Sequence, residues 1–153
     1  MTRYKLIDTI TGWVVFAVAA VVYLMTIEPT ASFWDCPEFI VSAYKLEIGH
    51  PPGAPFFMLL GNLFTQFTSD PTQVAKMVNA MSALLSAFTI LFLFWTITHL
   101  TRKLVLSKDK TELTLAQTIA VMGSGIVGAL VYTFSDTFWF SAEEDEVYAF
   151  SSM

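Results

Sequence analysis

Charged residues are scarce in this chain, and their scarcity limits what kind of protein it can be. They make up 14% of the 153 residues, whereas a water-soluble domain carries about a quarter. Hydrophobic residues reach 55% and the mean hydropathy is +0.61, so the composition indicates an integral membrane protein. An aromatic content of 15% excludes a disordered chain.

Cysteine and basic residues are also few. The single cysteine, Cys36, excludes an internal disulfide framework and any zinc site built from several thiolates. The net charge is −5 and the eight Lys and Arg form no basic stripe, so nucleic acid is not an expected partner. The first expected partner is the lipid bilayer itself.

Three runs without a charged residue are long enough to cross a bilayer, whose hydrocarbon core of about 30 Å requires roughly 20 apolar residues in a helix. They cover residues 9–27, 77–100 and 113–135. We therefore predict an all-α membrane protein with three transmembrane helices. The first run exceeds the ~7–15 apolar residues of a signal peptide and no small-x-small cleavage site follows it, so we interpret it as a signal anchor.

The distribution of Lys and Arg predicts how these helices are oriented. Six of the eight cations lie before the first run or in the loop 101–112, together with three acids. The loops 28–76 and 136–148 hold ten carboxylates but only Lys45 and Lys76 as cations. Because cytoplasmic loops carry the excess of Lys and Arg, we expect the N-terminus and the loop 101–112 in the cytoplasm and both acidic loops outside.

A fourth apolar stretch, residues 51–67, lies within the first outer loop. It is near the lower length limit for a span, and if it crossed the bilayer it would place the basic loop outside. A short tilted span is the alternative. We predict instead a helix on the outer leaflet, with these side chains on its lipid side: Phe56, Phe57, Leu59, Leu60, Leu63 and Phe64.

Small residues recur at a spacing of four on the second and third spans. This spacing lets helix backbones approach closely in lipid, although small residues are also common in membrane helices generally. The residues concerned are Ser82, Ala83, Ser86 and Ala87 on the second span and Ser124, Gly125, Gly128 and Ala129 on the third.

The first outer loop contains two carboxylates beside aromatic and proline residues. Asp35 follows Trp34 at the expected membrane surface, where partial exclusion of water suits a carboxylate to act as a general base. Glu38 lies three residues on and shares a face with Asp35 if the segment is helical. Pro37 is typical of a first helical turn, which would put Asp35 near the N-cap. The pattern fits a catalytic pair and a helix cap equally well.

Two further polar groups lie in the outer loops. His50 precedes Pro51 and Pro52, whose fixed φ angles make a stiff, extended element that can hold an imidazole beside a headgroup or simply separate two helices. The second loop carries four consecutive acids, residues 143–146. Such a run is typical of a solvated loop, although one or two members could bind a divalent cation or orient a substrate.

Longer motifs surround these residues: FWDCPEF at 33–39, GHPPGAP at 49–55, and Trp139 followed by EVYA at 146–149. A signal anchor, an acidic outer loop and a Pro-Pro element before an interfacial helix resemble the start of the GT-C membrane glycosyltransferases. The motifs are similar to one branch in particular. It is a large bacterial family long labelled a domain of unknown function, abundant in Bacteroidota and related to a vertebrate transmembrane protein O-mannosyltransferase.

The resemblance implies a multi-helix fold in the bacterial inner membrane with a catalytic face outside. It implies transfer of a sugar from a polyprenyl-phosphate carrier to a hydroxyl of an acceptor protein or glycan, with a divalent cation as a possible cofactor. In that scheme the catalytic residues are Asp35, as base, and Glu38. The substrate-binding residues are Trp34, His50, Pro51, Pro52 and Glu146.

The chain ends just after an apolar stretch, residues 147–150, so we expect it to be the N-terminal part of a longer protein. With so few outer cations to meet a carrier phosphate, we expect this part alone to be inactive. A second hypothesis is a non-enzymatic membrane subunit whose outer loops bind a partner in an envelope assembly. A transporter is disfavoured, because the spans carry no charge at their centres.

Overall fold

The computed structural model describes residues 3–33, 35–49, 54–106 and 112–143 of the chain. Over these residues the chain forms six α-helices and one short 3-10 helix, η1, and no strand. The order is α1 (Arg3–Thr26), α2 (Cys36–Lys45), α3 (Pro55–Thr65), η1 (Pro71–Gln73), α4 (Val74–Val105), α5 (Leu115–Thr133) and α6 (Asp136–Glu143). The predicted all-α class is confirmed.

Within the described residues, α1, α4 and α5 are long and apolar enough to cross a membrane, which confirms the three predicted spans. α1 and α4 extend beyond the charge-free runs 9–27 and 77–100, because a helix does not end at its first charged residue. α4 has 32 residues and is about 48 Å long, so it projects from a hydrocarbon core of about 30 Å. α5 starts after Thr114, which forms a capping box with Gln117, and is shorter than expected.

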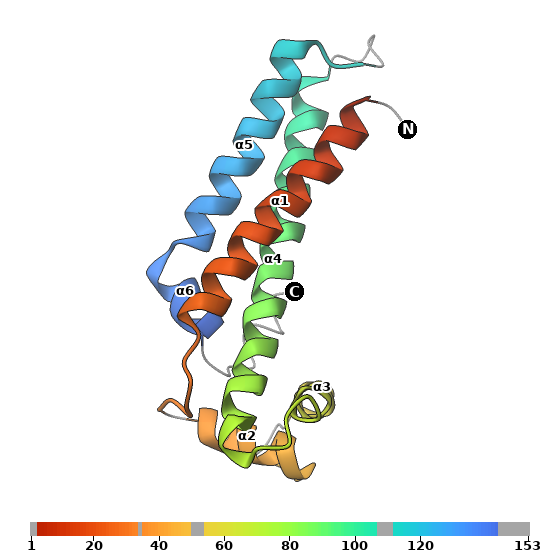
Figure 1. Cartoon of the computed structure of the whole chain (residues 1–153). Helices are drawn as coiled ribbons and strands as arrows, with labels where there is room; N and C mark the ends of the chain where they lie inside the picture. The colour runs from red at the N-terminus through yellow and green to blue at the C-terminus, as the bar shows by residue number, and fades with distance from the viewer. Residues whose placement is uncertain (1–2, 34, 50–53, 107–111, 144–153) are drawn as a thin grey trace.

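α1 and α5 pack along α4 as a three-helix bundle (Figure 1). A Cβ added to Gly125 of α5 would lie 2.5 Å from Cγ2 of Thr98 on α4, and one added to Gly12 of α1 would lie 2.6 Å from Nε1 of Trp95. The small residues predicted on the second span are all buried in α4, namely Ser82, Ala83, Ser86 and Ala87. The small-residue spacing thus predicted correctly where the helices approach closely.

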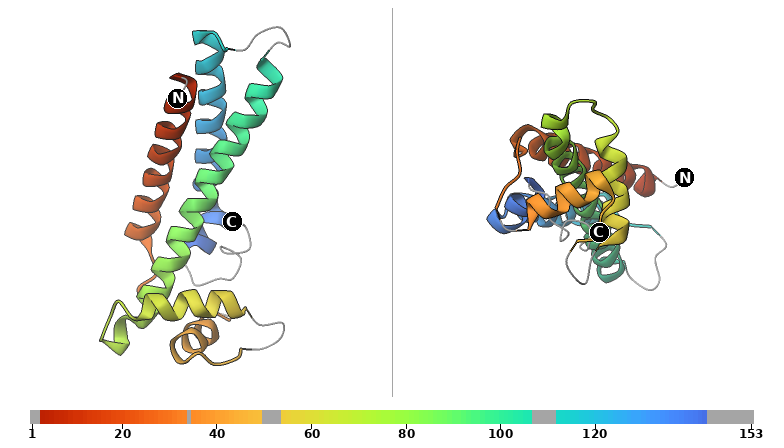
Figure 2. Two further views of the ribbon diagram at one scale, coloured as in Figure 1. Left: turned by 90° about the vertical axis from the view of Figure 1, so that its right-hand side faces the viewer. Right: turned by 90° about the horizontal axis from the view of Figure 1, so that it is seen from below.

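α2 and α3 lie crosswise to α4 at its N-terminal end (Figure 2). We call these two helices the platform. At 11 residues, about 16 Å, α3 is too short to cross the bilayer, which favours the interfacial helix over the tilted span. One hydrophobic cluster forms the core of the bundle. The platform and α4 share a second hydrophobic cluster, formed by Cys36, Ile40, Ala43, Phe57, Met58, Val74, Val78 and Met81.

The apolar residues of α3 divide between two faces, which corrects the prediction that six of them lie on the lipid side. Phe57 is 1% exposed within the second cluster, and Leu60 and Phe64 pack against that cluster. One face of α3 therefore holds α2 and α4, and the other is left for lipid. On that other face the exposed fractions are 57% for Phe56, 60% for Leu59 and 55% for Leu63.

The second outer loop was expected over residues 136–148, but its first part is the helix α6. The chain turns directly from α5 into α6, and the backbone N–H of Trp139 donates to the carbonyl of Ser135 at 2.9 Å. Phe138 and Ala142, four residues apart, pack into the bundle core and hold the helix there. The other residues of this loop lie outside the described part of the chain.

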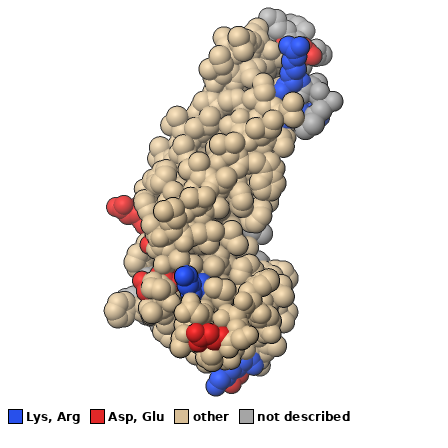
Figure 3. Space-filling view, viewed as in Figure 1, with Lys and Arg blue, Asp and Glu red and all other residues tan. Residues whose placement is uncertain are grey.

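Charge separates the two ends of the bundle (Figure 3). On the face shown, a band free of charged atoms lies between a blue group at one end and mixed charges at the other. The cations Arg102 and Lys103 occupy the last turn of α4, whereas Asp35 and Glu38 lie at the start of α2 in the platform. A band of this kind suits the hydrocarbon region of a bilayer.

Candidate functional site on the platform

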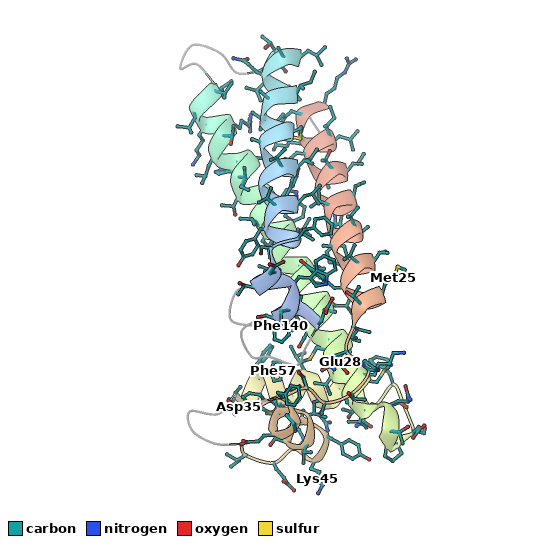
Figure 4. All side chains as sticks on the ribbon, turned by 90° about the vertical axis from the view of Figure 1, so that its left-hand side faces the viewer. Met25, Glu28, Asp35, Lys45, Phe57 and Phe140 are labelled. Carbon is teal, nitrogen blue, oxygen red and sulfur yellow. The ribbon has the colours of Figure 1, made fainter. Side chains whose placement is uncertain are left out.

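Two of the predicted site residues, Asp35 and Glu38, belong to the described part of the chain. Figure 4 shows Asp35 in the platform region, below the end of α1. The other five lie outside the described residues, and their roles stay predictions: Trp34, His50, Pro51, Pro52 and Glu146.

Asp35 is the N-cap residue of α2, and Pro37 occupies the first turn, as the sequence predicted. The carbonyl of Asp35 accepts a hydrogen bond from the N–H of Phe39 at 3.0 Å, which opens the helix. Its carboxylate, however, makes no capping hydrogen bond to the start of α2. A capping hydrogen bond is therefore not what Asp35 contributes at this position.

The surroundings of Asp35 differ from the expected ones. The sequence predicted partial exclusion of water around Asp35, but Asp35 is exposed and the nearby Phe33 is 84% exposed. Any exclusion of water at this carboxylate must come from Trp34, from the membrane surface or from other parts of the protein. Within the described residues Asp35 is a solvent-facing acid at the edge of the platform.

Glu38 is exposed on the same first turn, and its side chain lies against Gly49. A Cβ placed on Gly49 would be 3.1 Å from Oε1 of Glu38. The turn after α2 explains this contact, since it reverses the chain and sends residues 47–49 back along the helix. The platform thus brings the start of the GHPPGAP motif to the Asp35–Glu38 turn, two motifs that the sequence showed only as separate.

The two platform helices are fixed to each other at their crossing. A Cβ on Gly61 of α3 would lie 2.8 Å from Cβ of Ala43 on α2, so the crossing depends on a glycine. The neighbouring Asn62 donates from Nδ2 to the carbonyl of Ala43 at 3.0 Å and to that of Tyr44 at 3.1 Å. These bonds add donors to carbonyls in the last turn of α2, where the usual intrahelical donors four residues on are missing.

Asp70 lies at the junction between the platform and α4. Its Oδ1 accepts a hydrogen bond from the backbone N–H of Thr72 at 2.9 Å, which caps η1. Because this bond favours the charged form, the pKa of the Asp70 carboxyl lies below its usual value. The junction therefore keeps an ionised cap at neutral pH.

One residue that the sequence did not single out, Asn79, lies at the junction of α1, α4 and α6, together with Glu28 and Glu143. Asn79 of α4 is fully buried and bonds to the segment after α1. Glu28 donates its backbone N–H to the carbonyl of Glu143 at 3.3 Å. Asn79 carries no charge and lies inside an apolar run. The only signal in the sequence that could have identified it as a candidate is its polar side chain.

Metal ligands do not gather in this part of the chain. Among the described residues no three His, Cys, Asp or Glu side chains come together as a metal site would require. Most of the acidic run 143–146 lies outside those residues, so a divalent cation there stays a prediction.

No solved structure matches the chain. Two curated relatives are the Dictyostelium discoideum protein O-mannosyl-transferase tmem260 and the mouse protein O-mannosyl-transferase TMEM260. The first is 27% identical over 139 residues, which cover 90% of this chain and 15% of the relative. The second is 29% identical over 140 residues, which cover 91% of this chain and 17% of the relative. The chain thus spans a small part of the length of either relative.

The match to a family model begins at the candidate site. Residues 35–153, most of the chain, match the model described as the protein O-mannosyl-transferase TMEM260 N-terminal domain. Asp35, Glu38 and the GHPPGAP motif all lie within the matched residues. The chain therefore belongs to the family of TMEM260 N-terminal domains.

Proposed function

We propose that the chain is the N-terminal part of a GT-C-type membrane glycosyltransferase. The enzyme moves a sugar from a polyprenyl-phosphate carrier to a hydroxyl acceptor, and the names of the relatives support mannose and a protein acceptor. The observation that carries this proposal is the setting of Asp35. It is an exposed carboxylate at the N-cap position of α2, at the edge of an interfacial platform.

In the proposed reaction Asp35 accepts the proton of the acceptor hydroxyl. The hydroxyl oxygen forms a bond to the anomeric carbon in line with the leaving group, the bond from that carbon to the carrier phosphate oxygen breaks, and the phosphate leaves with the electron pair. Glu38 orients the acceptor from the same turn of α2. Substrate binding falls to Trp34, His50, Pro51, Pro52 and Glu146.

The leaving phosphate needs a cation or an array of donors to stabilise its charge. On the platform side the chain offers only Lys45 and Lys76, and both are exposed. We therefore assign the main phosphate ligand to parts of the protein outside residues 1–153. Positioning of base, carrier and phosphate ligand together supplies much of the rate in such a displacement.

The proposed orientation places the platform and α6 on the outer face and the N-terminus in the cytoplasm. The last turn of α4 carries Arg102 and Lys103, as cytoplasmic helix ends commonly do. The resemblance to the Bacteroidota family supports a bacterial inner membrane, whereas the two relatives named above come from eukaryotes.

Replacing Asp35 by Asn in the full-length protein tests the catalytic role. The substitution preserves shape while removing the base, so membrane insertion should continue and transfer should fall by about 10²–10⁴-fold. Glu38→Gln is the matched control on the same turn. It should lower the transfer rate less than Asp35→Asn does, because Glu38 orients the acceptor and transfers no proton. The measurement is sugar transfer to a native acceptor, normalised to inserted protein.

The results separate the candidate functions. If Asp35→Asn is active and Glu38→Gln is dead, Glu38 is the base. If both variants transfer sugar normally, the loop is not catalytic and a non-enzymatic subunit becomes the better description.

A further inference from the structure

The segment between α1 and α2, which leads to Asp35, is held by a buried side chain of α4. Asn79 is 0% exposed, and its Nδ2 donates hydrogen bonds to the carbonyl oxygens of Glu28 at 2.8 Å and of Thr30 at 3.1 Å. Only the nitrogen end of an amide can face two carbonyl oxygens, so these acceptors fix its orientation. The carboxylate of Glu28 in turn accepts from the hydroxyl of Thr30 at 2.7 Å.

The same segment is joined to α6. The backbone N–H of Glu28 donates to the carbonyl of Glu143 at 3.3 Å. Nε1 of Trp139 donates to Oγ1 of Thr26 at 3.2 Å and to the carboxylate of Glu143. The start of the segment therefore bonds to α4 through Asn79 and to α6 through Glu143, and the end of α1 just before it bonds to α6 through Trp139.

The asparagine carries a cost that an apolar residue would avoid. Its Oδ1 is buried and has no hydrogen-bond partner among the described residues. An unpaired buried acceptor disfavours the folded state, and the residues on either side of Asn79 in the helix, Val78 and Ala80, are apolar. The two bonds to the segment are the gain that offsets this cost.

We propose that Asn79 is a positioning residue of the reaction, which fixes the segment after α1 and thereby the place of the Asp35 carboxylate at the membrane surface. Asn79 does not touch the substrate. α4 also contributes side chains to the second hydrophobic cluster, which holds α2. One helix therefore fixes the positions of both the segment before Asp35 and the helix after it. The inference rests on the proposed function, because the position of Asp35 affects the rate only if Asp35 is the base of the reaction.

The test combines a distance measurement with transfer kinetics in the full-length protein. Spin labels at Phe33→Cys and at Thr96→Cys on α4 report how tightly the segment is held. The background carries Cys36→Ala and the replacement of any further cysteine in the full-length protein. Asn79→Ala and Asn79→Asp remove the two donated bonds. Ser86→Ala is the matched control, because it deletes another buried unpartnered polar atom of α4 without touching the segment.

Both Asn79 variants should broaden the distance distribution, and Ser86→Ala should leave it as narrow as in the parent. Without the labels, kcat for transfer should fall by about 10–100-fold in the Asn79 variants, because a misplaced catalytic group costs rate, while KM for the lipid-linked sugar stays near that of the parent. A residue needed only for folding would lower the amount of inserted protein, but the inserted protein would keep the kcat of the parent.

Two results would overturn the inference and leave the proposed function intact. One is an unchanged distance distribution in the Asn79 variants; the other is a broadened one with unchanged kcat, in a protein that Asp35→Asn inactivates. If Asp35→Asn is itself fully active, the proposed function fails and the inference fails with it. Should the charge in Asn79→Asp prevent insertion, Asn79→Ala decides.

Discussion

Leu46 shows how a single residue shapes the site. It follows α2 with φ 53° and ψ 44°, in the left-handed region that costs a leucine about 1–2 kcal/mol. Its N–H donates to the carbonyl of Ala43 at 3.4 Å, and that of Glu47 donates to the carbonyl of Ser42 at 2.9 Å. This is the Schellman arrangement, usually made with glycine, and it turns the chain back toward Glu38.

Leu46→Gly should therefore stabilise the protein by about 0.5–1 kcal/mol, because glycine adopts this conformation without strain. Lys45→Gly, one residue earlier and inside the helix, should destabilise it by a similar amount. Unfolding of both variants in the same detergent gives the comparison. A Leu46→Gly protein less stable than the parent would mean that the leucine side chain matters more than its backbone strain.

Two glycines of α5 make a matched pair at the scale of helix packing. Gly125 faces α4, where an added Cβ would also lie 2.8 Å from Cε2 of Phe94, whereas a Cβ on Gly123 would meet nothing within 4 Å. Gly125→Ala should therefore cost about 1–3 kcal/mol of stability, as overpacked cores do. Gly123→Ala should be neutral or slightly stabilising, since alanine favours a helix by up to about 1 kcal/mol. Thermal unfolding in lipid nanodiscs measures both, and equal effects would contradict the close contact of α4 and α5.

Elements with a strong periodic or apolar signal were predictable from the sequence, and those fixed by tertiary contacts were not. Charge-free runs predicted the spans, and Pro37 predicted the start of α2. The sequence did not reveal α6, because eight residues with an acid at each end resemble a loop. The helix depends on the packing of Phe138 into the bundle core, which only the folded chain shows. Asn79 was missed for the same reason, since only the folded chain brings Glu28 and Thr30 to it.

At the scale of the whole molecule, the positive-inside pattern predicts the topology. In a Cys36→Ala background, cysteine at Glu112 should be labelled by an impermeant reagent only from the cytoplasm, and cysteine at Thr72 or Thr137 only from outside. All three native side chains are exposed. Labelling of Thr72 and Thr137 from opposite sides would require an odd number of crossings between them, instead of the two made by α4 and α5, and would overturn the three-span topology.

The chain by itself should transfer no sugar. It carries the turn with the proposed base, Asp35, and part of the second segment proposed to lie outside, but we assign the phosphate ligand elsewhere in the protein. The proposed displacement requires these groups to be held together. Purified residues 1–153, incubated with a polyprenyl-phosphate sugar and an acceptor, provide the measurement, with the full-length protein as the positive control. Measurable transfer by the short chain would contradict this assignment.

The second hydrophobic cluster joins residues that leave the ribosome at different times. Cys36 and Phe57 of the platform meet Val78 and Met81 of α4, so their apolar surface is covered only after α4 has been synthesised. Until then α2 and α3 have each other and the lipid surface, on which the exposed face of α3 can rest. A chain interrupted before α4 would leave this cluster open to aggregation and proteolysis. Insertion of α4 is therefore the step of biosynthesis that sets Asp35 in place.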